Sequence, residues 1–281
     1  AATALPWQDF VQDERLREII NLALANNRDL RVAIKNIELA QAQYRVTRAD
    51  IGPTLGASFT GSRTRTGDAP IASSYTIGLG ISDWELDLFG RLRSLNNAAL
   101  AKYLATEEAR KTTHISLIGS VASAWLNLQA DSELLALAER TLATREQSQA
   151  LIKLRLNAGV SSALDMRQAE SQAAAARASR AEQKRLRAED LSNLALLAGQ
   201  PIAEQLLPKA DETQLSGFAD VPAGLSSDVL LRRPDIRQAE QQLIAANANI
   251  GAARAALYPS ISLTGNIGYS SPELDQMIKA P

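Results

Sequence analysis

The sequence predicts a mainly α-helical protein with a small antiparallel β part. First, no proline interrupts residues 91–199, so a very long helical segment can form there. Second, residues 55–60 and 74–82 alternate apolar with small or polar side chains, which is the period of a strand. Third, alanine carries much of the 46% hydrophobic fraction and aromatic residues make up only 4%. This composition suits long packed helices better than a compact enzyme core.

The proline-free segment predicts a helical hairpin whose two arms meet at residues 156–162. On the first arm, apolar residues recur every three, four or seven positions, as on one helix face: Ile118, Val121, Trp125, Leu128, Leu135 and Leu142. On the second arm, small residues form a similar stripe: Ala169, Ala173, Ala176 and Ala181. We expect Ser161 or Ser162 to cap the second arm, with Asp165 in its first turn.

The arms of this hairpin differ in length. At roughly 1.5 Å per residue, residues 91–156 would span about 99 Å and residues 163–198 about 54 Å. A separate helix expected over residues 28–50 would add about 34 Å, so the two shorter helices could lie end to end along the long one. Helices of this length are longer than one small globular core can cover, so we expect neighbouring subunits or repeats to cover the rest of their surface.

A short amphipathic helix is expected within residues 1–25. Asp13 and Glu14 lie near its start, and its apolar side consists of Leu16, Ile19, Ile20, Ala23 and Leu24. Asn26 and Asn27 separate it from the helix at 28–50, which Gly52 and Pro53 terminate.

The two alternating segments predict a β-hairpin with a polar loop, Arg63 to Ser73, that contains a Gly67–Asp68 turn. Each run has about the length that a tilted strand needs to cross a bilayer, and the small polar face opposite suits a water-filled lumen. A half-buried hairpin on a soluble sheet carries the same alternation and is, by pattern alone, the more frequent case.

Residues 84–91 connect the second strand to the long helix. Glu85 and Asp87 could form a carboxylate pair for acid–base chemistry, but negative charge beside a helix start is the favoured interpretation. Trp84 and Phe89 would either lie at a membrane interface or pack the junction.

After Gly199, a turn-rich connector leads to Arg233, with short helices expected at 202–207 and 228–232. Pro234 can occupy the first turn of a further helix that continues to about residue 257, and residues 260–264 alternate as a strand.

This last part repeats the beginning of the chain. A shift of 206 residues places Asp29 on Asp235 and Pro53 on Pro259, so both copies read helix, proline, strand. We therefore expect one and a half repeats of a two-repeat protein, with the second copy breaking off at Pro281.

Charge and composition argue against several functional classes. The 30 basic and 31 acidic residues balance to a net charge of −1, which gives no reason to expect a nucleic-acid partner. Without cysteine, neither a disulfide framework nor a thiolate metal site can form. His114 is the only histidine and has no nucleophile in a suitable context, and Gly78 and Gly80 lack the third glycine of a dinucleotide loop. We expect no enzymatic activity, no cofactor and no metal.

Four stretches together point to a family: residues 26–33 (NNRDLRVA), 84–93 (WELDLFGRLR), 221–236 and 245–264. From Leu5 onward, the chain resembles the outer-membrane efflux channels of the TolC/OprM type, the exit ducts of Gram-negative tripartite drug pumps. The resemblance implies a homotrimer in the outer membrane, in which each subunit gives four strands to a shared twelve-stranded barrel and long helices to a periplasmic α-barrel. It also implies a periplasmic adaptor protein and an inner-membrane RND pump as partners.

The resemblance also implies where the functional residues lie. Lipid-facing side chains would be Phe59, Tyr75, Ile77, Leu79 and Ile81, with the loop 63–73 outside the cell. The hairpin bend would form a periplasmic tip that narrows the pore and meets the adaptor: Arg155, Asn157, Ala158, Gly159, Val160, Ser161, Ser162 and Asp165. For Arg155 and Asp165, a solvated helix end explains the charges equally well.

The implied domain organisation has four parts. Residues 1–26 and 199–233 would form equatorial segments, 27–52 and 91–198 the periplasmic helical domain, 53–90 the transmembrane β-hairpin, and 234–281 the start of the second repeat. A soluble coiled-coil scaffold or adaptor protein is the rival class. It would explain the helices equally well but not the small polar face opposite Tyr75 to Ile81.

Overall fold

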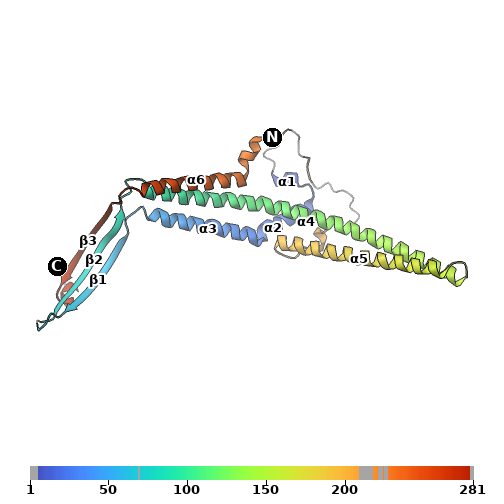
Figure 1. Cartoon of the computed structure of the whole chain (residues 1–281), viewed down its shortest axis with the longest axis horizontal. Helices are drawn as coiled ribbons and strands as arrows, with labels where there is room; N and C mark the ends of the chain where they lie inside the picture. The colour runs from blue at the N-terminus through green and yellow to red at the C-terminus, as the bar shows by residue number, and fades with distance from the viewer. Residues whose placement is uncertain (1–5, 69, 209–217, 221–223, 225–226, 279–281) are drawn as a thin grey trace. The chain divides into compact units, whose positions relative to one another are not determined.

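A computed structural model describes residues 6–68, 70–208, 218–220, 224 and 227–278 (Figure 1). The chain divides into two compact units, Ala1–Ile34 with Arg110–Arg233, and Lys35–Ala109 with Pro234–Pro281. Helices α3 (Arg28–Ala49) and α4 (Arg91–Asn157) contribute residues to both units. The predicted mainly helical class with a small antiparallel sheet is confirmed.

The first unit is built around α2 (Glu14–Asn26). The carboxylate of Asp13 accepts hydrogen bonds from the backbone N–H groups of Arg15 (2.8 Å) and Leu16 (3.1 Å), which caps this helix as expected. Four of its five predicted apolar residues are fully buried, and Leu24 packs against them half-buried. The other elements of this unit are α1 (Trp7–Phe10), α5 (Ala163–Ala198), and the 3-10 helices η2 (Glu204–Leu206) and η3 (Ser227–Arg232).

Helices α4 and α5 form the predicted hairpin, with α5 running back along α4 (Figure 1). Val121, Trp125 and Leu128 of α4 join Leu194 of α5 in the core around α2. Towards the bend, polar side chains link the arms: Arg177 to Glu146 (3.0 Å), Arg180 to Glu139 (3.4 Å) and Arg145 to Gln172 (3.1 Å). These contacts are exposed, so each contributes little stability by itself.

The predicted small-residue stripe of α5 is only partly correct. Ala169 and Ala173 are buried and Ala176 is half-buried, but Ala181 is exposed. Ala181 follows Ala176 by five residues, and five residues rotate a helix by about 140° relative to the starting face. Ala181 therefore points away from α4. Leu194 continues the buried face instead.

Gly199 ends α5 in a conformation that other residues rarely adopt. Its φ is 72°, and a Cβ atom there would lie 2.6 Å from the backbone oxygen of Asn26. Glycine therefore allows the end of α5 to approach the end of α2, where the side-chain amide of Asn27 donates to the carbonyl oxygen of Leu197 (3.0 Å).

The second unit contains a three-stranded antiparallel sheet in the order β1-β2-β3. Figure 1 shows the strands side by side. Their bounds are β1 Leu55–Thr64, β2 Ala72–Glu85 and β3 Ser262–Ser271, and the unit also holds α6 (Pro234–Ala255) and α7 (Leu274–Ile278). The predicted second copy of helix, proline and strand is confirmed by α6, Pro259 and β3.

Two details differ from the sequence-based expectations. The strands continue further into the hairpin than predicted, because Arg63 pairs with Ser73 and Thr64 with Ala72, so the loop is shorter than 63–73. Helix α7 was not expected. Among the described residues, no helix combines the length and the apolar character needed to cross a bilayer.

Candidate functional site

One face of the sheet is apolar and exposed. Directly paired residues of antiparallel strands point to the same side, and Phe59 pairs with Ile77 while Ala57 pairs with Leu79. The five residues predicted to face lipid therefore share this face: Phe59, Tyr75, Ile77, Leu79 and Ile81. Leu79 is 61% exposed and Phe59 60%, whereas Tyr75 and Ile81 are half-buried.

Strand β3 extends this apolar face beyond the predicted set. Ile267 pairs with Leu79 and is 79% exposed, and Tyr269 pairs with Ile77. Sequence reasoning missed both, because it ended the third strand at residue 264. The continued alternation of Ile267 and Tyr269 with Asn266, Gly268 and Ser270 was the available signal.

The opposite face carries only small and polar residues over the paired region. They are Gly56, Ser58, Thr60, Ser62, Ser74, Thr76, Gly78, Gly80, Asn266, Gly268 and Ser270. The hydroxyls of Thr76 and Ser270 lie 3.1 Å apart and hydrogen-bond across the strands. A Cβ atom on Gly268 would lie 2.5 Å from the carbonyl oxygen of Ile77, so the backbones of β2 and β3 approach too closely there for a side chain.

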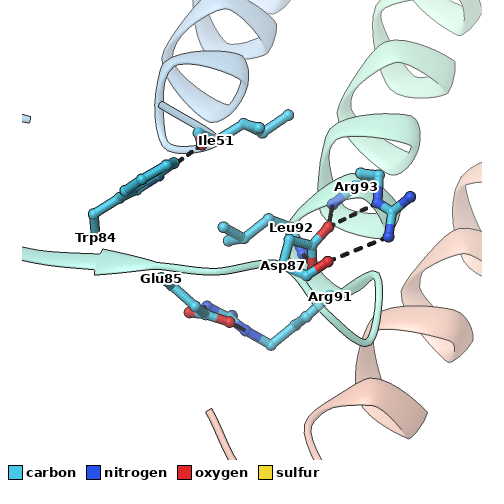
Figure 2. A network of polar contacts seen from close by, with 7 residues as sticks. All are labelled: Ile51, Trp84, Glu85, Asp87, Arg91, Leu92 and Arg93. Carbon is cyan, nitrogen blue, oxygen red and sulfur yellow. Dashed lines mark hydrogen bonds and ion pairs between the residues drawn. The ribbon is translucent and has the colours of Figure 1, made fainter. Parts of the chain in front are cut away.

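A β-bulge in β2 places Trp84 on the apolar face. The register shifts between Ile81 and Trp84, and Asp83 within the bulge has φ 52°. Trp84 consequently pairs with Leu263, which lies on the same face as Ile267 four residues along β3. The indole N–H of Trp84 donates to the backbone oxygen of Ile51 (3.0 Å), as Figure 2 shows.

Two carboxylates organise the junction between β2 and α4 (Figure 2). Glu85 forms an ion pair with Arg91, with 2.8 Å between Nε and Oε1. Asp87 accepts hydrogen bonds from the backbone N–H groups of Leu92 and Arg93, both at 3.0 Å, and from Nε of Arg93 at 3.1 Å. Each carboxylate forms an ion pair with a different arginine at the start of α4. This geometry confirms the favoured interpretation, negative charge beside a helix start, over a carboxylate pair for acid–base chemistry.

Phe89 packs at the same junction. Its ring stacks on Tyr258, with 4.6 Å between centroids and 12° between planes. Phe89 remains 49% exposed and Trp84 is half-buried, so membrane interface and junction packing both stay predictions for these two residues.

At the other candidate site, α4 ends in a glycine cap. The N–H of Val160 donates to the carbonyl oxygen of Arg155 (2.9 Å), and the N–H of Gly159 donates to that of Leu156 (2.9 Å). Gly159 has φ 75°, so this pair of hydrogen bonds forms the Schellman arrangement. The chain reverses within residues 157–162 as predicted.

Helix α5 then begins with a reciprocal capping box between Ser162 and Asp165, which confirms the predicted cap. The hydroxyl of Ser161 also donates to Asp165 (3.1 Å). The side-chain hydrogen bond from Ser162, followed by those from its backbone N–H and from Ser161, lowers the pKa of Asp165. The side chain of Arg155 forms no ion pair with Asp165 or with any other described residue.

The bend exposes apolar side chains beside these polar caps. Val160 is 73% exposed, and Leu154 and Leu164 flank it on the two arms in a similarly exposed position. The sequence-based prediction included Val160 but missed both leucines, which carry no signal that separates them from residues of the helix interface.

Clustered acidic or histidine ligands are absent from the described part of the chain, where no three such side chains are placed to hold a metal ion. His114 is half-buried in α4, and burial, assisted by the charge of Arg110, lowers the pKa of His114. The exposed apolar sheet face and the capped helical bend are therefore the two candidate functional surfaces.

Comparison with known proteins agrees with this geometry. The family model described as "Outer membrane efflux protein" matches residues 19–200 and 225–280. The toluene efflux pump outer membrane protein TtgC of Pseudomonas putida is 47% identical over 284 residues, which cover 99% of this chain and 58% of that protein. The outer membrane protein OprJ of Pseudomonas aeruginosa is 43% identical, over 98% of this chain and 59% of OprJ.

The solved open state of the MtrE outer membrane channel of Neisseria gonorrhoeae superimposes with a TM-score of 0.86 at 42% identity, over 99% of this chain and 63% of that chain. The chain thus spans less than two thirds of the length of each of these relatives. The family match over most of the sequence, with relatives identical at almost half of the aligned positions, shows that the chain belongs to the outer membrane efflux protein family.

Proposed function

We propose that this chain forms part of an outer-membrane exit duct that passively conducts substrates from a tripartite efflux pump to the cell exterior. The observation that carries the proposal is the exposed apolar face of β1, β2 and β3, which has polar residues on its reverse side. An exposed apolar surface of this kind calls for a hydrocarbon environment or a partner.

The height of this face supports a membrane location. Tyr75 and Trp84 mark its two ends on β2. Nine residues at about 3.3 Å each give about 30 Å along the strand, or about 23 Å in height at a tilt of roughly 40°. Outer-membrane barrels carry an apolar band about 25 Å tall, with aromatic residues at both edges.

The unpaired edges of the sheet support assembly with further strands. One edge of β1 and one edge of β3 have no partner strand among the described residues. In a bilayer, every backbone N–H and C=O group must be hydrogen-bonded, so a closed barrel shared between subunits would satisfy them. We therefore propose a homotrimer in the outer membrane, with residues 53–90 as its transmembrane hairpin and residues 234–281 as the start of the second repeat.

The helical bend suits contact with a periplasmic adaptor protein, and through it with an inner-membrane RND pump. It combines exposed apolar residues such as Val160 with a backbone that is capped at Gly159 and Ser162. In this proposal, residues 27–52 and 91–198 lie in the periplasm, while residues 1–26 and 199–233 form equatorial segments. Conduction needs no covalent step, because a water-filled duct only has to open at its tip.

Membrane fractionation of cells that make the protein tests this proposal. We expect the protein to fractionate with the outer membranes and to dissolve only in detergent. A crosslinker at Val160 should capture an adaptor subunit. A crosslinker at Arg185, which lies on α5 away from the bend and is paired with Glu182 and Glu189, serves as the control. Recovery of the protein in the detergent-free soluble fraction would favour the coiled-coil scaffold instead.

A further inference from the structure

Two arginines lie at the hairpin end of the sheet, beyond the last aromatic residue of its apolar face. Arg63 pairs with Ser73, and it lies on the same face as Phe59, four residues earlier on β1. Arg65 follows immediately after the end of β1. Both side chains are exposed.

These two guanidinium groups are not neutralised within the described part of the chain, where neither forms an ion pair or a hydrogen bond. At the opposite end of β2, by contrast, Arg91 and Arg93 are paired with Glu85 and Asp87. Unmatched positive charge therefore collects at the hairpin end of the sheet, where the sequence contains a single acidic residue, Asp68.

The position of Arg63 matches the depth of a lipid headgroup. Tyr75 pairs with Gly61, and its ring covers that glycine, because a Cβ atom on Gly61 would lie 3.1 Å from a ring carbon. Tyrosine prefers the level where the hydrocarbon ends, and Arg63 lies two residues, or about 7 Å, further out on the same face. A long side chain there can extend its charged group to the phosphate level.

An apolar hollow lies on the same face below these arginines. It has a volume of about 400 Å³ over the small side chain of Ala57, and Ile77, Leu79, Ile267 and Tyr269 border it. Arg63 lies six positions after Ala57 on β1, which is about 20 Å at the usual rise. An acyl chain in the hollow could thus belong to a lipid whose headgroup lies beside Arg63.

We propose that Arg63 and Arg65 bind the phosphate of an anionic lipid in the outer leaflet, whose acyl chain occupies the hollow over Ala57. Arginine suits this ligand because its planar guanidinium group offers parallel N–H donors to two phosphate oxygens. The proposal rests on the proposed function in requiring that this sheet face contacts the membrane and that its hairpin end lies on the outer side.

Lipid retention measured by native mass spectrometry tests the site. The membrane-extracted protein is exchanged into neutral detergent with diphosphoryl lipid A, a phosphorylated glycolipid, or with the same glycolipid stripped of phosphate. We expect Arg63→Gln with Arg65→Gln to weaken binding of the phosphorylated form about tenfold. Arg28→Gln with Arg45→Gln, which replaces two exposed arginines of α3, should leave binding unchanged.

Insertion into neutral phosphatidylcholine vesicles is measured by flotation for the same variants, which separates the two proposals. Wild-type protein that inserts but binds both glycolipid forms equally would overturn the phosphate site and leave the exit-duct proposal standing. Equal lipid A binding by wild type and by the Arg63/Arg65 variant would do the same. Failure of every variant to insert would overturn the membrane location and the lipid site with it.

Discussion

The carboxylate of Asp165 accepts the backbone N–H of Ser162 at 2.9 Å, while the hydroxyl of Ser162 accepts the backbone N–H of Asp165 at 3.1 Å. This reciprocal pair fixes the first turn of α5 immediately after the bend. The candidate adaptor surface is therefore held by hydrogen bonds between two neighbouring residues, while its apolar side chains stay exposed.

Replacement of Ser162 by alanine should loosen the bend. The variant loses one side of the capping box, and such losses cost about 1 kcal/mol. We expect faster amide hydrogen exchange in residues 163–166 without a change in the core around Trp125. Ser148→Ala serves as a control, because Ser148 donates only to the carbonyl oxygen of Thr144 within α4. Equal exchange in both variants would contradict the assigned cap.

Acidification should weaken the same bend. Hydrogen bonds from Ser162 and Ser161 lower the pKa of Asp165 below its ordinary value of 3.8. The stabilisation is therefore fully present above the unfolded pKa and is lost as the pH falls through the lower folded value. Carboxyl NMR titration should show a pKa for Asp165 below 3.8, and in Ser162→Ala it should move back towards that value. An unchanged pKa in that variant would rule out Ser162 as the cause.

Replacement of Gly268 by alanine should disrupt the pairing of β2 with β3. The added Cβ atom would lie 2.5 Å from the backbone oxygen of Ile77, so the strands must separate locally, at a cost of roughly 1–3 kcal/mol. Gly265→Ala is the matched control on the same strand, because no atom lies within 4 Å of its added Cβ. Urea unfolding in vesicles should show a lower midpoint for Gly268→Ala alone.

Replacement of Leu79 by arginine should impair membrane insertion. Leu79 lies midway between Tyr75 and Trp84 on the apolar face, and an arginine at the bilayer midplane costs about 2–4 kcal/mol. Ser58→Arg places the same charge on the opposite face, because Ser58 pairs with Gly78. Flotation with vesicles should be reduced for Leu79→Arg and retained for Ser58→Arg. The reverse order would show that the polar face contacts lipid.

Local sequence patterns predicted most of the helices and their ends. The second arm of the hairpin matches α5 (Ala163–Ala198) at both ends, and the long arm extends only one residue beyond the expected 91–156. Such features depend on contacts between residues a few positions apart, so a single sequence contains the information for them. The shared face of Phe59, Tyr75, Ile77, Leu79 and Ile81 follows on the same basis, because alternation along one strand decides which side chains lie together. Their contact with lipid was implied by the family resemblance and stays a prediction.

What only the tertiary structure decided depends on pairings between distant residues. Strand β3 pairs with β2 although 194 residues separate Thr76 from Ser270. This pairing places Ile267 and Tyr269, whose alternation the sequence does show, on the same face as Leu79 and Ile77. The bulge at Asp83 keeps Trp84 on that face, although simple alternation from Ile81 would place it on the other. Strand register and bulges are set by hydrogen bonds between two strands, and no periodicity within one segment encodes them.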